Sequence, residues 1–173
     1  MRFDWKSLST LDRVIAGGAA VAFIAAFLPW YGVSVAGFSV TVSGWSAGFS
    51  AWAGALLLTA AGVLLVLRRA GASVPSLGGA GPSVVVAGIA ALGLLLVIVR
   101  WLSLPSYHGS AAGFNYNYGA RYGLFLALIA GIAMVAAAVM ELRASGEQLP
   151  WAKSHHTAEP AEQAPEAPAV PEE

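Results

Sequence analysis

Two arginines, Arg100 and Arg121, stand at the two ends of one loop that is rich in aromatic residues. A planar guanidinium donates parallel hydrogen bonds to a phosphate group, so this spacing suits a lipid headgroup. Trp101 and Tyr122, beside the two arginines, are residue types that gather where a membrane meets water. These four residues are therefore candidates for lipid-headgroup contacts. The simpler interpretation, which we favour, is that both arginines only anchor the ends of helices at headgroup level.

His108 in the same loop lies two residues from Ser106 and two from Ser110, which suggests a serine nucleophile with its base. Such a pair also needs an acidic group that orients the base. All nine acidic residues of the chain fall on the other side of the membrane in the topology derived below. We therefore predict no catalytic residues and no enzymatic activity.

A second group of possible ligands lies near the C-terminus, where His155 and His156 precede Glu159 and Glu162. Imidazole and carboxylate groups bind Zn²⁺ or Ni²⁺. These residues belong to a Pro-, Ala- and Glu-rich tail, residues 144–173, which is expected to be disordered because it cannot bury enough apolar surface. The chain has no Cys, which excludes disulfides and thiolate ligands. We predict no metal site and no cofactor.

The elements that position these residues follow from composition, because 58% of the 173 residues are apolar and only 10% are charged, against about 25% charged in a soluble domain. Four uniformly apolar segments are long enough to cross a bilayer: residues 12–31, 49–68, 83–102 and 121–142. Trp30, Trp52 and Trp101 fall near their ends, where aromatic belts form. No ionisable residue lies deep inside a segment, which argues against a proton relay or an ion pathway.

The basic residues predict the orientation of these four spans. If both termini lie on one side, that side carries every basic residue except Arg100 and Arg121, so both termini are expected in the cytoplasm. A cleaved signal peptide is the alternative for the first segment. Asp4 and Asp12 in its head region, and the bulky residues 27–31 at its end, favour an uncleaved span.

Strand patterns occur in both loops on the outer side. In Tyr31–Gly48, apolar and polar residues alternate over 33–43 around Ala36-Gly37, which predicts a β-hairpin. In the second outer loop, aromatic residues recur at every second position over 114–118. This spacing predicts a third strand that pairs with the hairpin.

On the cytoplasmic side, the connector Ala70–Pro82 holds four Gly and two Pro and predicts a flexible loop. The tail, residues 144–173, is interpreted as a solubilising end, with a protein-binding tether as the alternative. In the fourth span, Gly123, Ala127 and Gly131 follow at four-residue intervals. Small residues at this spacing allow close helix packing, either within the bundle or between two copies.

A family resemblance is carried by residues 27–31 (FLPWY), 44–49 (GWSAGF) and 51–52 (AW). Over residues 10–142 the chain resembles small four-span membrane proteins of actinobacteria, which are mostly of unassigned function. The resemblance implies a bacterial plasma membrane and supplies no active site. The layout is also similar to that of claudins, but Gly44-Trp45 lacks the Leu of their Gly-Leu-Trp motif and the paired cysteines are absent, so this likeness concerns architecture only.

We therefore predict an all-α transmembrane fold, in which residues 1–143 form a four-helix bundle with a small extracytoplasmic β-hairpin and a disordered cytoplasmic tail follows. The predicted function is a non-enzymatic accessory or scaffold subunit of a bacterial plasma membrane. Its partners would be membrane lipids and a membrane protein or a second copy, whereas a net charge of zero provides no attraction to nucleic acid. The alternative is an oligomeric transporter or channel component for a small molecule or lipid, with Arg100 and Arg121 at its entrance.

Overall fold

The computed structural model describes residues 8–35, 37–72, 81–104, 107–111 and 114–146. These residues form four helices, α1 (Thr10–Phe27), α2 (Phe49–Arg69), α3 (Pro82–Ser103) and α4 (Tyr122–Ser145). They also form four strands, β1 (Pro29–Val35), β2 (Phe38–Ser43), β3 (Tyr107–Ala111) and β4 (Phe114–Ala120). Most of the predicted flexible connector and the predicted disordered tail beyond Gly146 lie outside the described residues.

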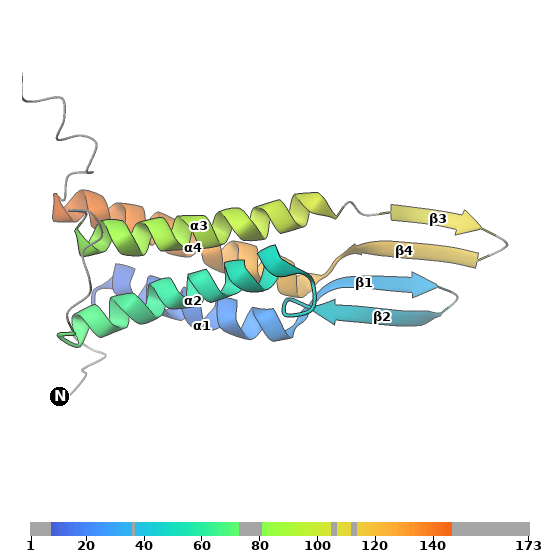
Figure 1. Cartoon of the computed structure of the whole chain (residues 1–173), viewed down its shortest axis with the longest axis horizontal. Helices are drawn as coiled ribbons and strands as arrows, with labels where there is room; N and C mark the ends of the chain where they lie inside the picture. The colour runs from blue at the N-terminus through green and yellow to red at the C-terminus, as the bar shows by residue number, and fades with distance from the viewer. Residues whose placement is uncertain (1–7, 36, 73–80, 105–106, 112–113, 147–173) are drawn as a thin grey trace, which may run out of the picture.

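The described part of the chain is elongated, with the helices side by side and the strands extending beyond one end of them (Figure 1). In the bundle, α1 and α3 each pack between α2 and α4. We call the end where the strands project the sheet end, and the opposite end, where α1 begins and α4 finishes, the terminal end. Each of the four helices is long and apolar enough to cross a membrane.

The first helix is shorter than the predicted span of residues 12–31. It ends at Phe27, and Leu28 already has an extended backbone, with φ −79° and ψ 161°. Pro29 explains this, because the proline ring disfavours helical angles in the preceding residue. Trp30 and Tyr31 consequently belong to β1, where both are buried. The prediction that Trp30 belongs to an aromatic belt is therefore wrong.

The strands form one antiparallel sheet in the order β2-β1-β4-β3. The predicted hairpin is confirmed as β1 and β2, and Gly37 between them has a positive φ of 84°, which suits a glycine in a tight turn. The predicted third strand is confirmed as β4, which pairs with β1. The sequence patterns did not indicate β3. The cap is therefore a four-stranded sheet, larger than the predicted small hairpin.

Glycines bring the helices of the bundle into close contact. Gly54 of α2 faces Gly93 of α3, since a Cβ built on either residue would lie 3.0 Å from the carbonyl oxygen of the other. A Cβ on Gly62 of α2 would overlap the side chain of Ala19 on α1. Backbones approach this closely only where side chains are small, so these glycines fix α2 against both α1 and α3.

The predicted packing residues Gly123, Ala127 and Gly131 all face the interior of the bundle. A Cβ on Gly123 would lie 2.7 Å from the carbonyl oxygen of Pro29, at the start of β1. Ala127 is fully buried, and Gly131 lies against leucine side chains of α2 and α3. Of the two alternatives, these residues therefore pack within one chain.

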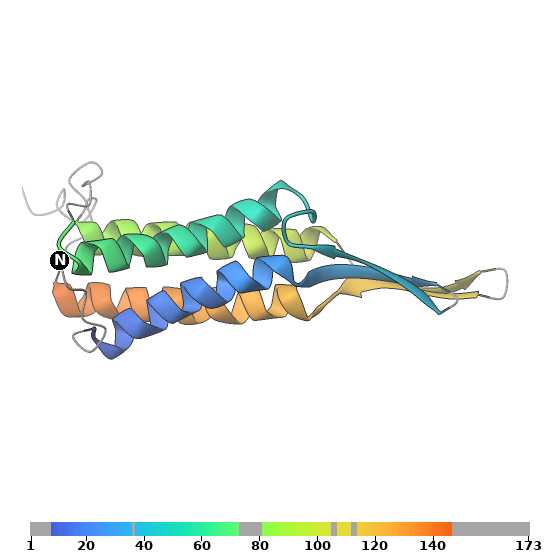
Figure 2. The same cartoon turned by 90° about the horizontal axis from the view of Figure 1, so that it is seen from below.

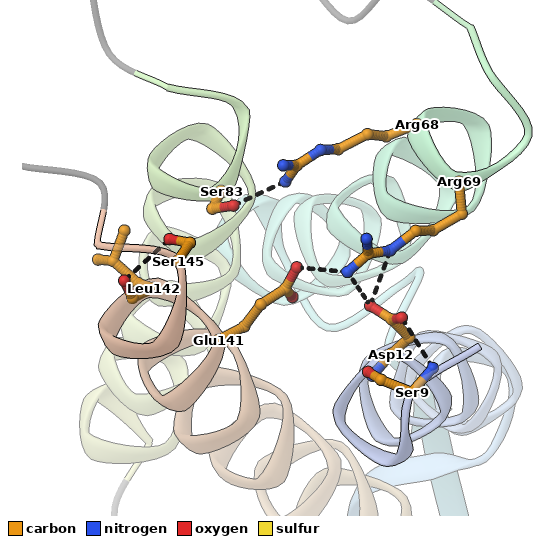
Figure 3. A network of polar contacts seen from close by, with 8 residues as sticks. All are labelled: Ser9, Asp12, Arg68, Arg69, Ser83, Glu141, Leu142 and Ser145. Carbon is orange, nitrogen blue, oxygen red and sulfur yellow. Dashed lines mark hydrogen bonds and ion pairs between the residues drawn. The ribbon is translucent and has the colours of Figure 1, made fainter. Parts of the chain in front are cut away.

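At the terminal end, Arg69 of α2 joins two acidic residues from other helices (Figure 3). Its Nε and Nη2 donate to Asp12 Oδ1 of α1 at 3.2 and 2.9 Å, and Nη2 also donates to Glu141 Oε1 of α4 at 2.8 Å. The Asp12 side chain is only 2% exposed. Its other oxygen accepts the backbone N–H of Ser9 in the capping box that begins α1. One arginine therefore ties three helices together.

The preceding residue, Arg68, links α2 to the remaining helix, because its Nη1 donates to Ser83 Oγ of α3 at 2.7 Å (Figure 3). Two consecutive arginines of α2 thus hold all three other helices at the terminal end. In the sequence, these two arginines indicate only the orientation of the spans. The structure shows that they also fasten the bundle.

Candidate functional site: the two faces of the sheet

The sheet projects from the bundle as a single layer. Figures 1 and 2 show the strands extending past the helices, with no helix over either face. Side chains alternate between the two faces along each strand, and cross-strand partners share a face. The pairs Val33–Val40 and Val33–Tyr118 belong to one face, and Ser34–Ser39 and Ser34–Asn117 belong to the other. The register therefore separates apolar from polar side chains.

The apolar face of the sheet is formed by side chains of β1, β2 and β4, namely Tyr31, Val33, Val35, Phe38, Val40, Val42 and Tyr118. A shallow groove of about 210 Å³ runs between the three strands on this side. Phe38 is 82% exposed and Val40 is 71% exposed. Apolar side chains of this size are rarely left open to solvent in a contiguous group unless they contact a partner.

The opposite face carries a second hollow, of about 500 Å³, which we call the polar groove. The groups that line it include two glycines and four polar side chains, namely Gly32, Gly119, Ser34, His108, Asn117 and Arg121. Gly32 and Gly119 are cross-strand partners. Because neither glycine has a side chain, the floor of the groove leaves room for an overlying side chain.

Trp30 fixes the sheet to the bundle. The residue is fully buried, and its Nε1 donates to the carbonyl oxygen of Ala25 in α1 at 2.8 Å. Its own carbonyl oxygen accepts the backbone N–H of Arg121, where α4 begins, at 2.8 Å. Gly44 and Gly123 leave room for the indole, since a Cβ on either would lie within 3.0 Å of it. Trp30 therefore packs the sheet against both α1 and α4.

Arg100 lies on the same side of β1 as Tyr31. Its guanidinium carbon is 5.4 Å from the centre of the Tyr31 ring, and the Tyr31 hydroxyl donates to the Arg100 carbonyl oxygen at 2.9 Å. Burial raises the pKa of Tyr31, and the charge of Arg100 opposes that shift. The hydroxyl consequently stays protonated and donating at neutral pH. Arg100 is thereby held against the end of the bundle.

Arg121 lies on the other side of β1, over Gly32. A Cβ on Gly32 would meet Arg121 Nε at 2.6 Å, so the arginine side chain lies directly on the glycine backbone. Its Nη2 donates to Ser34 Oγ at 3.1 Å. Successive residues of a strand point to opposite faces, so β1 separates Arg100 from Arg121. The structure therefore does not bring the two predicted headgroup arginines together around one phosphate.

The two aromatic residues of the predicted headgroup set lie at the sheet end of the helices. Trp101, near the end of α3, is exposed and contacts Phe125 of α4 edge to face, with ring centres 6.3 Å apart. Tyr122, the first residue of α4, is also exposed. Both positions are compatible with a membrane interface, and their contact with lipid stays a prediction.

His108 has a partner other than the two serines that suggested a nucleophile. Its Nδ1 lies 2.7 Å from Asn117 Oδ1 on the adjacent strand, an arrangement in which the ring N–H donates and the amide oxygen accepts. Ser106 lies outside the described residues. Within the described ranges, no group of three His, Asp or Glu side chains could hold a metal ion, and His155 and His156 fall beyond them.

Sequence reasoning missed the polar groups that line the groove together with Arg121, namely Ser34, His108 and Asn117. The alternation that predicted the strands already places Ser34 and Val33 on opposite faces. However, the pairing of β1 with β4 decides which polar residues of the second loop join Ser34, and the sequence did not provide this register. No protein-family model, curated protein or solved structure matches this chain, so the resemblance to actinobacterial four-span proteins stays a prediction.

Proposed function

We propose that the chain is a multi-pass protein of a bacterial plasma membrane that acts without chemistry, as an accessory or scaffold subunit. Its helices would cross the bilayer with the terminal end in the cytoplasm and the sheet outside. The apolar face of the sheet would hold a partner membrane protein. The observation that carries this proposal is the exposure of Phe38 and Val40 on a sheet that no described element covers.

The distribution of charge supports this orientation. Arg13, Arg68, Arg69 and Arg143 belong to the terminal end of the helices, whereas Arg100 and Arg121 belong to the sheet end. Basic residues are enriched on the cytoplasmic side of membrane proteins. The capping box of α1 and the contacts of Arg69 also satisfy polar groups at the terminal end, where the helices would leave the hydrocarbon.

The outer edge of β2 indicates how a partner would bind. β2 is an edge strand with β1 as its one neighbour, and its sequence, Phe38–Ser43, contains no charge and no proline. Edge strands of proteins that avoid association usually carry such protective residues. An apolar segment of a partner could therefore approach past this edge and lie over the apolar face of the sheet, where it would cover Phe38, Val40 and Val42.

The alternative of a transporter needs a passage through the middle of the bundle. The interior of the bundle is filled by alanines and by larger side chains such as Leu58, Leu124 and Met134. Gly54 and Gly93 bring α2 and α3 into backbone contact, which leaves no room for a path there. We therefore place the function on the sheet.

A photo-crosslinking residue at position 40 tests the proposal in native membranes. Position 39, on the opposite face of the same strand, provides the matched control. We expect irradiation to link the position-40 protein to a different membrane protein in a defined ratio, and the position-39 protein to form this product far less. Combining Val42→Lys with the crosslinking residue at position 40 should remove the crosslinked product. The lysine ammonium would lose its hydration when a partner covers the apolar face, and this cost opposes binding.

Three results would overturn the partner proposal. One is equal crosslinking from positions 39 and 40, which would indicate contact without face specificity. Another is crosslinking to lipid alone. The third is a product that contains only two copies of this chain, which would replace a partner subunit by a homo-oligomer.

A further inference from the structure

We infer that the polar groove is a binding site for a phosphate group, centred on Arg121. This inference does not depend on the proposed protein partner, because that partner would bind the opposite face of the sheet. The site combines one guanidinium with a serine hydroxyl, an imidazole and an amide, around a floor of two glycines. These groups come from β1, β3, β4 and the residue that precedes α4.

The position of Arg121 is built into the fold. Its backbone N–H donates to Trp30 and its Nη2 donates to Ser34 Oγ, while the side chain lies on Gly32, where any Cβ would displace it. A guanidinium has five N–H donors. Within the described chain, Ser34 is the only hydrogen-bond partner of this one. Several donors therefore remain for a ligand that enters the groove.

The charge of Arg121 is not balanced by any carboxylate among the described residues. No Asp or Glu occurs between residues 13 and 140 of the sequence, and the carboxylates of the described residues, Asp12 and Glu141, lie with Arg69 at the opposite, terminal end of the helices. A cation without a counter-charge in a hollow attracts an anion from outside. A planar guanidinium matches the oxygens of phosphate in a bidentate arrangement.

The other lining groups suit the same ligand. The Nδ1–H of His108 donates to Asn117 Oδ1, which orients the ring and leaves Nε2 of the neutral imidazole as an acceptor for a P–O–H group or a hydroxyl of the ester substituent. The Ser34 hydroxyl accepts from Arg121 and still has its own proton to donate. A volume of about 500 Å³ admits a phosphate together with its ester substituent. The phosphate could belong to a lipid headgroup or to a free phosphate compound, and the test separates these sources.

The test follows thermal unfolding of the full chain in dodecyl maltoside through its tryptophan fluorescence. Inorganic phosphate and dihexanoyl phosphatidylglycerol are titrated separately at constant ionic strength, with chloride as the reference. A ligand that binds the folded state raises the midpoint in a saturable way. We expect such a rise with at least one phosphate probe. Arg121→Gln should weaken the apparent affinity by about tenfold or more.

Matched variants make the result specific. Arg143→Gln removes the same charge from the exposed terminal end and should leave the affinity unchanged. Arg121→Lys keeps the charge but loses the planar guanidinium, so an intermediate affinity is expected. If Arg121→Gln does not fold, the affinity of Arg121→Lys is compared with that of the wild type instead. A response to phosphatidylglycerol alone assigns a lipid headgroup, and a response to inorganic phosphate assigns a free anion. No rise above chloride with either probe, or equal losses in the Arg121 and Arg143 variants, would overturn the inference.

Discussion

Replacing Arg69 with methionine is expected to destabilise the folded chain by about 2–4 kcal/mol. The substitution removes both hydrogen bonds to Asp12, whose carboxylate is 2% exposed and would remain in the bundle without its cation. When one partner of a buried ion pair is removed, the desolvation free energy of the remaining charge is no longer offset by the attraction between the two charges. The Arg69 side chain is itself 38% exposed, so water offsets part of the effect. Thermal unfolding in detergent measures it.

A double variant separates this cause from a loss of packing. Asp12→Asn combined with Arg69→Met removes both charges, and an amide oxygen can still accept from the backbone of Ser9. We expect the double variant to recover most of the stability lost by Arg69→Met, because removing both partners is often close to neutral. If Arg69→Met unfolds at the wild-type temperature, or if the double variant is no more stable than the single one, Arg69 does not hold the helices as described.

The second large effect is expected at the junction of sheet and bundle. Trp30→Ala should cost about 3–5 kcal/mol, because it empties a fully buried indole site that rigid neighbours cannot fill. It also removes the hydrogen bond to Ala25. Since the same residue contacts α1 and the start of α4, we expect protease cleavage in the sheet to accelerate together with the fall in the unfolding midpoint.

Trp101→Ala is the matched control for this prediction, because Trp101 lies at the same end of the helices but is exposed. Its loss removes an edge contact with Phe125 and should cost about 1 kcal/mol or less. Similar destabilisation by both substitutions would show that the sheet is not anchored through Trp30.

The helices and three of the four strands could be predicted because their patterns are local. Long apolar segments indicate the helices, and alternation over 33–43 indicates β1 and β2. The predicted first span extends to Tyr31 because residues 27–31 remain apolar, whereas the effect of Pro29 on Leu28 ends the helix at Phe27. The sequence therefore contains a local signal for the end of α1, namely Pro29, but the apolar character of the residues around it favours a longer span.

Strand β3 lacks such a pattern, because Tyr107–Ala111 includes glycine and serine and no β-branched residue. One signal did exist. The sequence Ala-Gly-Phe links β1 to β2 at residues 36–38 and recurs at residues 112–114, between β3 and β4. A repeated turn sequence would have suggested a second hairpin.

The contacts of the arginines were not predictable from one sequence. Arg69 meets Asp12 across 57 positions and Arg121 meets Ser34 across 87, and both contacts depend on how distant elements pack. The proximity of Arg100 and Arg121 to the same loop suggested a shared ligand. The alternation of side chains along β1 instead places them on opposite faces of one strand.

Cysteine labelling in intact cells tests most directly whether the helices carry the sheet to the outside of a membrane. The chain has no cysteine, so Ser39→Cys on β2 and Ala72→Cys after α2 each introduce a single exposed thiol. With a membrane-impermeant maleimide, we expect the residue-39 thiol to react in intact cells and the residue-72 thiol to react only after the membrane is opened. Reaction of both thiols in intact cells, or of the residue-72 thiol alone, would contradict the proposed arrangement.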